Sequence, residues 1–302
     1  NNFLHLPIIN IWTEKLRSLL LTQFPEMVHK RIPASFSLSL DIDNPWAHLN
    51  KSLFRLTGGI MKSIFTGRWD AVRERFSVIR GKEKDPYDNY EFIRKNHSKE
   101  LLIFILTGDR GINDNKVKIR NKNWRKLIKE LSTHYKIGLH PSIHSNSSYE
   151  ILEKEKQNLE EITGEASKLS RQHFLMMEFP STYENIINLG IENDFSMGYA
   201  DHVGFRAGTS SSFNFYNIDK EEETKLRITP FCVMDRTLKD YLKLDEILAF
   251  ELIQELIDQI HKYGGNFVSI WHNESFSGKG EWKNWDQLYL RMLKELNHKF
   301  TL

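Results

Sequence analysis

The 302-residue sequence is poor in cysteine, and Cys232 is its single example. One thiol cannot form a disulfide within the chain, and it excludes a zinc site built from several cysteines. Cys232 lies in the apolar stretch 229–234, and no motif for a catalytic base flanks it. This setting favours a buried, inert thiol over a nucleophile.

The sequence also lacks a long apolar run. The longest clean one, Leu101–Leu106, falls far short of the roughly 18 residues that a transmembrane helix needs. No signal peptide is visible, which favours the cytoplasm, but the chain does not begin with Met, so the compartment stays open. Internal repeats and low-complexity linkers are absent as well.

Neither sign of charge is in large excess, because the chain has 42 Lys and Arg and 40 Asp and Glu, for a net charge of +2. This balance argues against a nucleic-acid-binding protein, which needs a basic face. The locally basic run 116–129 is interpreted as a solvated loop and helix face. Hydrophobic residues make up 40% of the chain and charged residues 27%, as in ordinary globular proteins. The length suits one large α/β domain with a modest extension, and the oligomeric state is not indicated.

Short apolar stretches alternate with helical patterns. Continuous apolar strands of this kind suit a parallel sheet that is covered on both faces, and the alternation predicts a βα barrel or an open α/β sheet. The predicted strands are Ser35–Asp43, Leu101–Asp109, Lys136–His140 and Asn266–His272. The predicted helices are Trp12–Phe24, Tyr149–Ile162, Thr182–Leu189, Asp245–Tyr263 and Trp285–Leu296.

We expect residues 1–34 to be an amino-terminal helical extension and residues 35–302 to be the barrel-like domain. Residues 47–99 interrupt the alternation and predict a helical insertion after the first strand. An insertion at that point would lie over the top of the sheet, where it could shape a substrate cleft.

Polar side chains stand at the carboxyl ends of the predicted strands, where α/β enzymes place their chemistry. They are Asp41, Asp43, Asp109, His140 and His272.

The segment His140-Pro-Ser-Ile-His144 has two histidines four positions apart. On one helical turn such residues point the same way, so two imidazoles could grip one ion. Two histidines and a carboxylate leave a divalent metal with open positions. The motif is weak by itself, and a pair of surface histidines is the alternative.

Asp41-Ile-Asp43 supplies carboxylates two positions apart, which leave the same face of an extended strand. One could bind metal while the other acts as a base, although a charged strand end is the alternative. His272 ends the last strand and could serve as a general acid or as a structural histidine.

The order of these motifs resembles that of the polysaccharide deacetylases of carbohydrate esterase family four, the NodB homology domain, over residues 35–275. The resemblance is to the bacterial subgroup whose first motif is Asp-x-Asp. Further matching segments are 170–175, 193–199, 204–209 and 230–238. Two motifs depart from the family pattern. Arg171-Gln-His173 replaces Arg-x-Pro, and Ile270-Trp-His272 replaces Leu-x-His.

The resemblance implies a distorted (β/α)7 barrel of the polysaccharide deacetylase type with a divalent metal at the carboxyl ends of its strands. Zn²⁺ is the expected metal, and Co²⁺, Ni²⁺ or Fe²⁺ are alternatives. The implied metal ligands are Asp43, His140 and His144. The implied catalytic residues are Asp41 as base, Arg171 to orient it, His272 as acid, and Asp194 or Asp235 as the partner of that acid.

Three further residues are expected to bind substrate. Arg206 has no place in the family pattern, and its Gly-Phe-Arg-Ala-Gly setting suggests a tight loop that grips an anionic sugar. Trp46 and Trp271 are the tryptophans expected in the cleft, with core packing as the alternative for each.

The sequence thus predicts a metal-dependent hydrolase that removes an acetyl group from an amino sugar or a polysaccharide, with N-acetyl favoured over O-acetyl. Two alternatives stay open. One is a hydrolase of cyclic or small-molecule amides on the same barrel, and the other is a non-catalytic glycan-binding protein.

Overall fold

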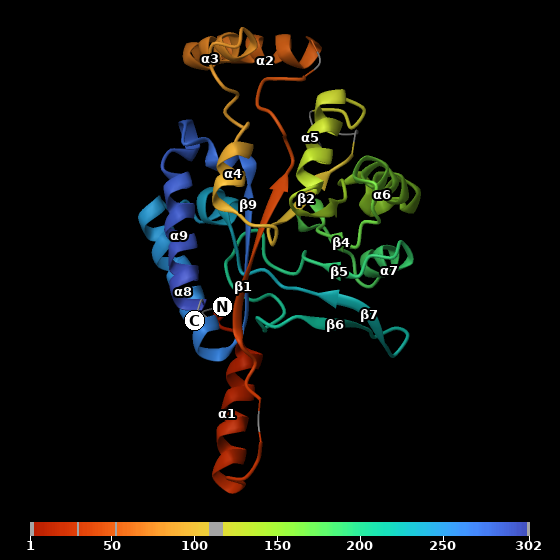
Figure 1. Ribbon diagram of the computed structural model, residues 1–302, viewed down its shortest axis with the longest axis vertical. Coiled ribbons are helices and arrows are strands. Elements are labelled where there is room, and N and C mark those ends of the chain that lie inside the picture. The colour runs from red at the N-terminus through yellow and green to blue at the C-terminus, as the bar shows by residue number, and fades with distance from the viewer. Residues whose placement is uncertain (1–2, 29, 52, 109–116, 301–302) are drawn as a thin grey trace.

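The computed structural model describes residues 3–28, 30–51, 53–108 and 117–300, so Asp109 lies outside the described residues. Its core is a nine-stranded sheet in the order β6-β7-β5-β4-β3-β2-β1-β9-β8 (Figure 1). The strands are β1 Ala34–Ile42, β2 Leu102–Leu106, β3 Lys136–His140, β4 Leu169–Ser170, β5 Asn193–Asp194, β6 Phe213–Asn217, β7 Glu222–Ile228, β8 Val233–Met234 and β9 Gly265–His272.

All neighbouring strands of the sheet run parallel except β6 and β7, which form an antiparallel pair. Every side chain of β2 is buried, as the unbroken apolar run predicts for a strand covered on both faces. Connections between parallel strands need crossovers, and helices supply most of them.

The helices are α1 Ile8–Gln23, α2 Leu53–Phe65, α3 Trp69–Ile79, α4 Tyr90–Asn96, α5 Lys122–Ser132, α6 Tyr149–Thr163, α7 Ser181–Asn188, α8 Glu246–Tyr263 and α9 Trp285–Phe300. Figure 1 shows α8 and α9 on one side of β1 and the helices α5, α6 and α7 on the other. The local sequence sets their ends. Asp245 caps α8 by accepting hydrogen bonds from two backbone N–H groups, and Gly264 follows it with a φ of 79°.

The architecture confirms the predicted fold class, a mostly parallel α/β sheet of the distorted-barrel kind. The sheet is open, since the described strands β6 and β8 form its two edges. Helices α2, α3 and α4 all lie between β1 and β2, in the segment predicted as a helical insertion. Among the described residues, no helix combines the length and the apolar character that crossing a membrane requires.

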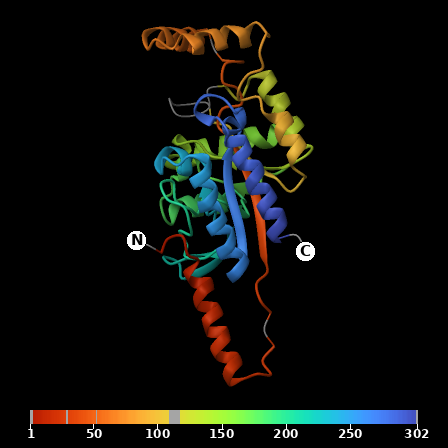
Figure 2. The same cartoon turned by 90° about the vertical axis from the view of Figure 1, so that its left-hand side faces the viewer.

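Helix α1 leaves the body of the molecule at its amino end and projects away from it (Figures 1 and 2). Buried Asn10 ties the start of the helix to the barrel by hydrogen bonds with Thr209, Ser211 and the Gly264 carbonyl. The division of the chain at residue 34 into an extension and a barrel domain stays a prediction.

Candidate active site

A cleft of about 410 Å³ opens at the carboxyl ends of the central strands. The parallel register brings these ends level, since Asp41 of β1 pairs with His272 of β9 and Leu106 of β2 with His140 of β3. Residues far apart in the chain therefore share one cleft. Its lining includes Asp41, Asp43, Asn44, Tyr87, His140, Gln172, His173, Phe174, Met234, Arg236, Tyr241, His272 and Glu274.

Three side chains in this cleft form a group that could hold a metal ion. Asp43, His140 and His173 each offer a ligand atom, and these atoms lie within 4.8 Å of one another. The Nε2 atom of His140 is 3.3 Å from Asp43 Oδ1, and that of His173 is 3.5 Å from Asp43 Oδ2. Two imidazoles and one carboxylate are a donor set suited to Zn²⁺ and related divalent ions.

The tautomer of His140 supports this interpretation. Its Nδ1 atom lies 2.5 Å from the backbone carbonyl oxygen of Arg171, which can only accept a hydrogen bond. The proton of a neutral His140 therefore sits on Nδ1, and the lone pair on Nε2 faces the cleft. A carbonyl that orients a histidine in this way is typical of metal sites.

The carboxylate of Asp43 gives a second indication of a cation-binding site. Its Oδ1 atom is buried and accepts no hydrogen bond from the described part of the chain. Burial alone would raise the pKa of Asp43, but the neighbouring imidazoles of His173, His140 and His272 lower it well below its usual value. Asp43 is therefore ionised, and its position suits a bound cation.

The structure places His144 outside this group, with an exposed side chain. The prediction of paired ligands assumed that His140 and His144 share one helical turn. Instead His140 ends strand β3, and a 3-10 helix begins only at His144. The two histidines therefore do not lie on one helical face.

Sequence reasoning missed His173 as a candidate ligand. It follows β4 in a short turn in which Phe174 and Leu175 have φ values of 55° and 54°, a region that side chains other than glycine seldom adopt. Strain of this kind gathers at functional sites. The available signal was the replacement of Arg-x-Pro by Arg171-Gln-His173, which puts a histidine two positions beyond the conspicuous arginine.

Asp41 and Arg171 form a buried pair beside the metal group. Arg171 Nη1 donates to Asp41 Oδ1 at 2.6 Å, and Arg171 Nη2 donates to Ser39 Oγ at 2.8 Å. The guanidinium is fully buried and stacks on Phe104, with Cζ 4.2 Å from the ring centroid. The second oxygen of Asp41, Oδ2, faces the cleft 3.9 Å from His140 Nε2.

His272 and Asp235 form a second buried pair. The Nδ1 atom of His272 lies 2.8 Å from Asp235 Oδ1, and the backbone N–H of His272 donates to Asp235 Oδ2. Burial alone would lower the pKa of His272, but the charge and hydrogen bond of Asp235, helped by Asp43 and Asp41, raise it to about 9. The free Nε2 atom is 3.7 Å from Asp43 Oδ2, so it faces the metal group.

Asp194 does not pair with His272, which leaves Asp235 as the partner of the two candidates. The Asp194 carboxylate accepts hydrogen bonds from Ser170 Oγ and from both the backbone N–H and the hydroxyl of Ser196. It therefore ties β4 to β5 beneath the cleft. Burial raises its pKa, and the hydrogen bonds from Ser170 and Ser196 only partly offset this.

The three predicted substrate-binding residues lie away from the lining of this cleft. Trp46 is buried edge-on against Trp124, with ring centroids 6.2 Å apart. Trp271 is 1% exposed and packs against Phe276 and other aromatic rings on the far side of β9. Arg206 is exposed, and its guanidinium donates to the backbone carbonyl of Gly198.

Two amide side chains of the cleft have unpaired polar atoms instead. Gln172 Nε2 and Asn44 Oδ1 are buried and make no hydrogen bond within the described residues. Buried polar groups are seldom left unpaired, so a donor and an acceptor in a cleft are natural contacts for a polar substrate.

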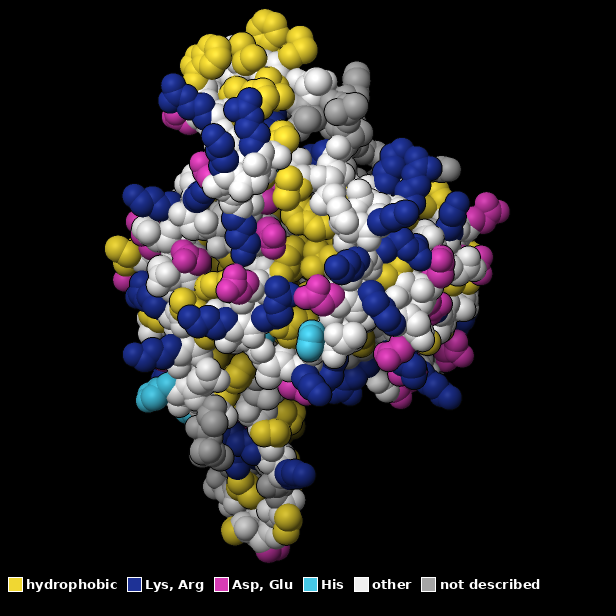
Figure 3. All heavy atoms as spheres, turned by 45° about the horizontal axis from the view of Figure 1, so that its top comes forward, with side chains coloured by type: hydrophobic (Ala, Val, Ile, Leu, Met, Phe, Trp, Pro, Cys, Tyr) yellow, Lys and Arg dark blue, Asp and Glu magenta, His cyan; other side chains and the backbone are white. Residues whose placement is uncertain are grey.

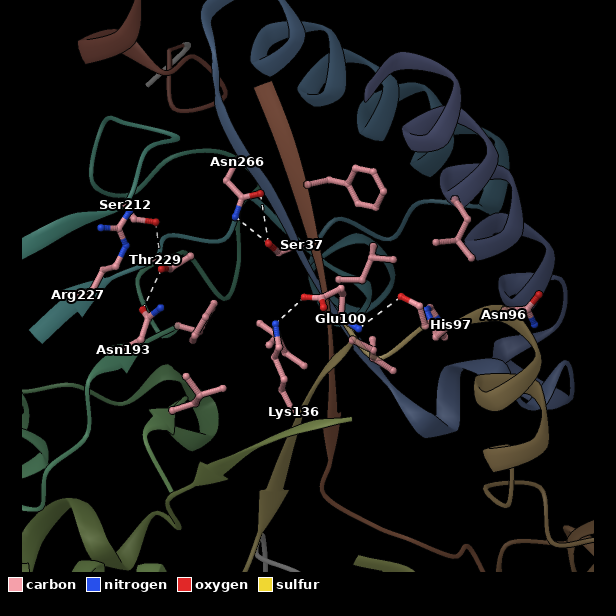
Figure 4. A pocket seen from close by; sticks show the side chains of 18 of the residues that line it. Ser37, Asn96, His97, Glu100, Lys136, Asn193, Ser212, Arg227, Thr229 and Asn266 are labelled. Carbon is pink, nitrogen blue, oxygen red and sulfur yellow. Dashed lines mark hydrogen bonds and ion pairs between the residues drawn. The ribbon is translucent and has the colours of Figure 1, made fainter. Parts of the chain in front are cut away.

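A larger cavity, about 750 Å³, lies at the opposite end of the strands (Figure 4). Its polar side chains mainly pair with one another, as Ser37 does with Asn266 and Lys136 with Glu100. It contains none of the residues that form the two buried pairs or the metal group. The larger cavity therefore lies apart from the metal group and the two buried pairs.

Comparisons with known proteins identify solved structures that share this fold. No family profile matches the sequence, and no curated protein sequence matches it. A solved structure from Mycobacterium smegmatis, named as a polysaccharide deacetylase, is 11% identical, with 89% of each chain covered and a TM-score of 0.52. This likeness shows that the chain has the fold of that protein, as the sequence resemblance predicted.

Two further solved structures match over similar lengths. A family 4 carbohydrate esterase from Streptomyces lividans is 9% identical, with 89% of this chain and 90% of that chain covered and a TM-score of 0.41. A polysaccharide deacetylase from Bacillus cereus is 11% identical, with 87% and 88% covered and a TM-score of 0.41.

Proposed function

We propose that the protein is a metal-dependent deacetylase that hydrolyses the acetyl group, preferentially N-acetyl, of an amino sugar or polysaccharide. The observation that carries this proposal is the pairing of Asp41 with Arg171 and of His272 with Asp235 on either side of one metal-type group. A glycan-binding protein would have no use for two buried proton-handling pairs in the same cleft. The shared fold supports the choice of reaction.

Asp43, His140 and His173 would hold the metal, with His173 in the place that the sequence suggested for His144. A divalent ion bound there, for which Zn²⁺ is the first candidate, would polarise the acetyl carbonyl and would lower the pKa of a nearby water molecule. The two histidines and the carboxylate leave room for substrate on the cleft side.

Asp41 acts as the general base. Its Oδ1 atom is held by Arg171, so Oδ2 is the oxygen that can take a proton from the attacking water. The hydrogen bond from the guanidinium fixes the orientation of the Asp41 carboxylate. The water oxygen then bonds to the acetyl carbon, and the carbon–nitrogen bond is ready to break.

His272 acts as the general acid from the other side. Asp235 holds Nδ1, so Nε2–H points into the cleft and donates its proton to the departing nitrogen. The unpaired Gln172 Nε2 would donate to the acetyl oxygen, and the unpaired Asn44 Oδ1 would accept from a substrate N–H or O–H. The products are acetate and a free amine.

The test is hydrolysis by the purified, Zn²⁺-loaded chain of three substrates. Acetate release is measured for an N-acetylglucosamine oligomer and an O-acetylated xylan, and ring opening is measured for a cyclic amide such as a hydantoin. We expect release from the N-acetylated oligomer, and loss of that release in Asp41→Asn with metal content unchanged. Ring opening of the cyclic amide alone would replace this proposal with the small-molecule alternative. Binding of the oligomer without turnover would make the protein a glycan-binding relative.

A further inference from the structure

The helices α2 and α3 pack against each other and stand away from the rest of the chain, beyond the carboxyl end of β1 (Figures 1 and 2). We call them the α2–α3 hairpin. Its two ends are tied together at the base. The carboxylate of Asp85 accepts hydrogen bonds from the backbone N–H groups of Ala47, His48 and Leu49, at 2.7–3.0 Å. The imidazole of His48 in turn contacts Glu74 of α3 at 2.8 Å.

The outer surface of the hairpin carries large apolar side chains that cover nothing. Phe65 is 83% exposed and Trp69 is 58% exposed, on either side of the turn between the two helices. Figure 3 shows apolar side chains gathered at this end of the molecule, with Lys and Arg side chains next to them. The other exposed apolar residues of the hairpin are Met61, Ile64, Phe76 and Ile79. A patch of this kind marks an interaction surface.

The second feature is a groove of about 290 Å³ on α3 and the turn after it, which we call the cationic groove. Three cations line it, Arg73, Arg80 and Lys82, together with the side chains of Val72, Phe76 and Ser77. Arg73 also lies 3.9 Å from Asp70, whereas Arg80 and Lys82 form no ion pair with a described residue. The groove is suited to an oxyanion such as a phosphate diester.

The net charge of residues 47–84 also favours an anionic partner. Residues 47–84 contain nine Lys and Arg against three Asp and Glu, a charge of +6 in a chain whose net charge is +2. Like charge opposes a second copy of the chain as the partner. A soluble polyanion would neutralise the cations but would leave Phe65 and Trp69 in water.

We propose that the α2–α3 hairpin docks on the surface of an anionic phospholipid bilayer. Phe65 and Trp69 enter the interface between head groups and acyl chains, and the cationic groove binds a lipid phosphate. Cations beside exposed aromatic and aliphatic residues are the combination found in interfacial helices. The cleft opens at the same end of the sheet, so docking would hold its mouth near the membrane.

The experiment is sedimentation of the full chain with vesicles, in about 0.1 M salt. One set is phosphatidylcholine alone, and the other contains about one third phosphatidylglycerol. We expect binding to the anionic set only, with release in about 1 M salt. Equal binding to both sets, or to neither, would overturn the proposal.

Two triple variants with the same change of charge separate the groove from general electrostatics. The groove variant combines Arg73→Glu, Arg80→Glu and Lys82→Glu. The control variant combines Lys154→Glu, Lys225→Glu and Lys294→Glu, at exposed positions elsewhere. We expect the groove variant to raise the apparent Kd for anionic vesicles at least about tenfold and the control to change it less than about threefold. Equal effects, or weaker binding of dextran sulfate with unchanged vesicle binding, would contradict the proposal.

Insertion of the hairpin into the bilayer is measured separately, by tryptophan fluorescence. This measurement does not depend on a change in affinity for the vesicles. Vesicles with brominated acyl chains quench a tryptophan that enters them. Trp69→Phe should abolish this quenching, whereas Trp12→Phe should not, because the exposed Trp12 belongs to α1 at the other end of the molecule (Figure 1). Quenching that disappears with Trp12→Phe instead would show that α1, and not the hairpin, meets the bilayer.

Discussion

Arg171 Nη1 lies 2.6 Å from Asp41 Oδ1, although the two residues are 130 positions apart in the chain. The guanidinium is fully buried, and Asp41 is its only charged hydrogen-bond partner among the described residues. A charge is rarely buried at such a position without a functional reason, because its desolvation is costly. The contact fixes one carboxylate oxygen and leaves the other facing the cleft, which is what a general base requires.

Asp41→Asn is expected to keep the metal and lose turnover. The amide can still accept a hydrogen bond from Arg171, but it cannot take a proton from water, so kcat should fall by about 10³-fold. The measurements are acetate release and metal content by mass spectrometry. A variant that keeps near-normal kcat would show that another group is the base.

His173→Ala and His144→Ala should affect metal affinity very differently. His173 belongs to the group with Asp43 and His140, whereas His144 lies outside it. Loss of an orienting contact around a metal already costs 10–100-fold in affinity, so loss of a ligand should cost about 100-fold or more. Zn²⁺ titration calorimetry would measure both variants. Weak binding in His144→Ala with normal binding in His173→Ala would restore the ligand set expected from the sequence.

Asp235→Asn should lower kcat by about 100-fold or more, because His272 would lose the partner that holds its tautomer and stabilises its charge. The matched variant is Asp194→Asn, which disturbs hydrogen bonds to Ser170 and Ser196 but not to His272. It should lower the unfolding temperature while kcat per folded molecule changes little. A large loss of kcat in Asp194→Asn with little change in Asp235→Asn would instead identify Asp194 as the partner of His272.

The buried side chain of His97 should make the stability of the fold depend on pH, independently of the active site. Burial lowers the pKa of His97 from 6.5 to about 4, and its Nε2 atom lies 3.0 Å from the hydroxyl of Tyr289. The unfolded chain binds a proton below pH 6.5, but the folded chain does not until about pH 4. The stabilisation is therefore complete above about pH 6.5 and is lost as the pH falls toward 4.

Urea unfolding at pH 7 and pH 5 measures this effect. The wild-type free energy of unfolding should drop by up to about 2 kcal/mol from this residue between the two pH values. His97→Gln should remove that share of the drop. An unchanged pH dependence in the variant would mean that His97 titrates normally in the folded protein.

The fold could be predicted because local sequence patterns specify its central strands and long helices. The buried run of β2 and the capped helix α8, between Asp245 and Gly264, needed no tertiary information. Strands β4, β5 and β8 are two residues long, too short to show any periodicity, and they exist only because their neighbours pair with them.

The candidate site likewise contains residues that the sequence pattern identifies and one that it does not. Asp41 and His272 were predictable because each lies at the carboxyl end of a recognisable strand. His173 could not be predicted in this way, because its position depends on a turn in which Phe174 and Leu175 have positive φ. No sequence pattern indicates that turn. Composition also could not tell a cleft tryptophan from a core tryptophan, and Trp271 packs in the core.

The central claim, that Asp43, His140 and His173 hold a catalytic divalent metal, is tested most directly by diffraction from crystals grown with Zn²⁺. Data collected on either side of the zinc absorption edge would locate the ion. We predict an anomalous peak bound by the Nε2 atoms of His140 and His173 and a carboxylate oxygen of Asp43. A peak bound by His144, or no peak between these three side chains, would contradict the account.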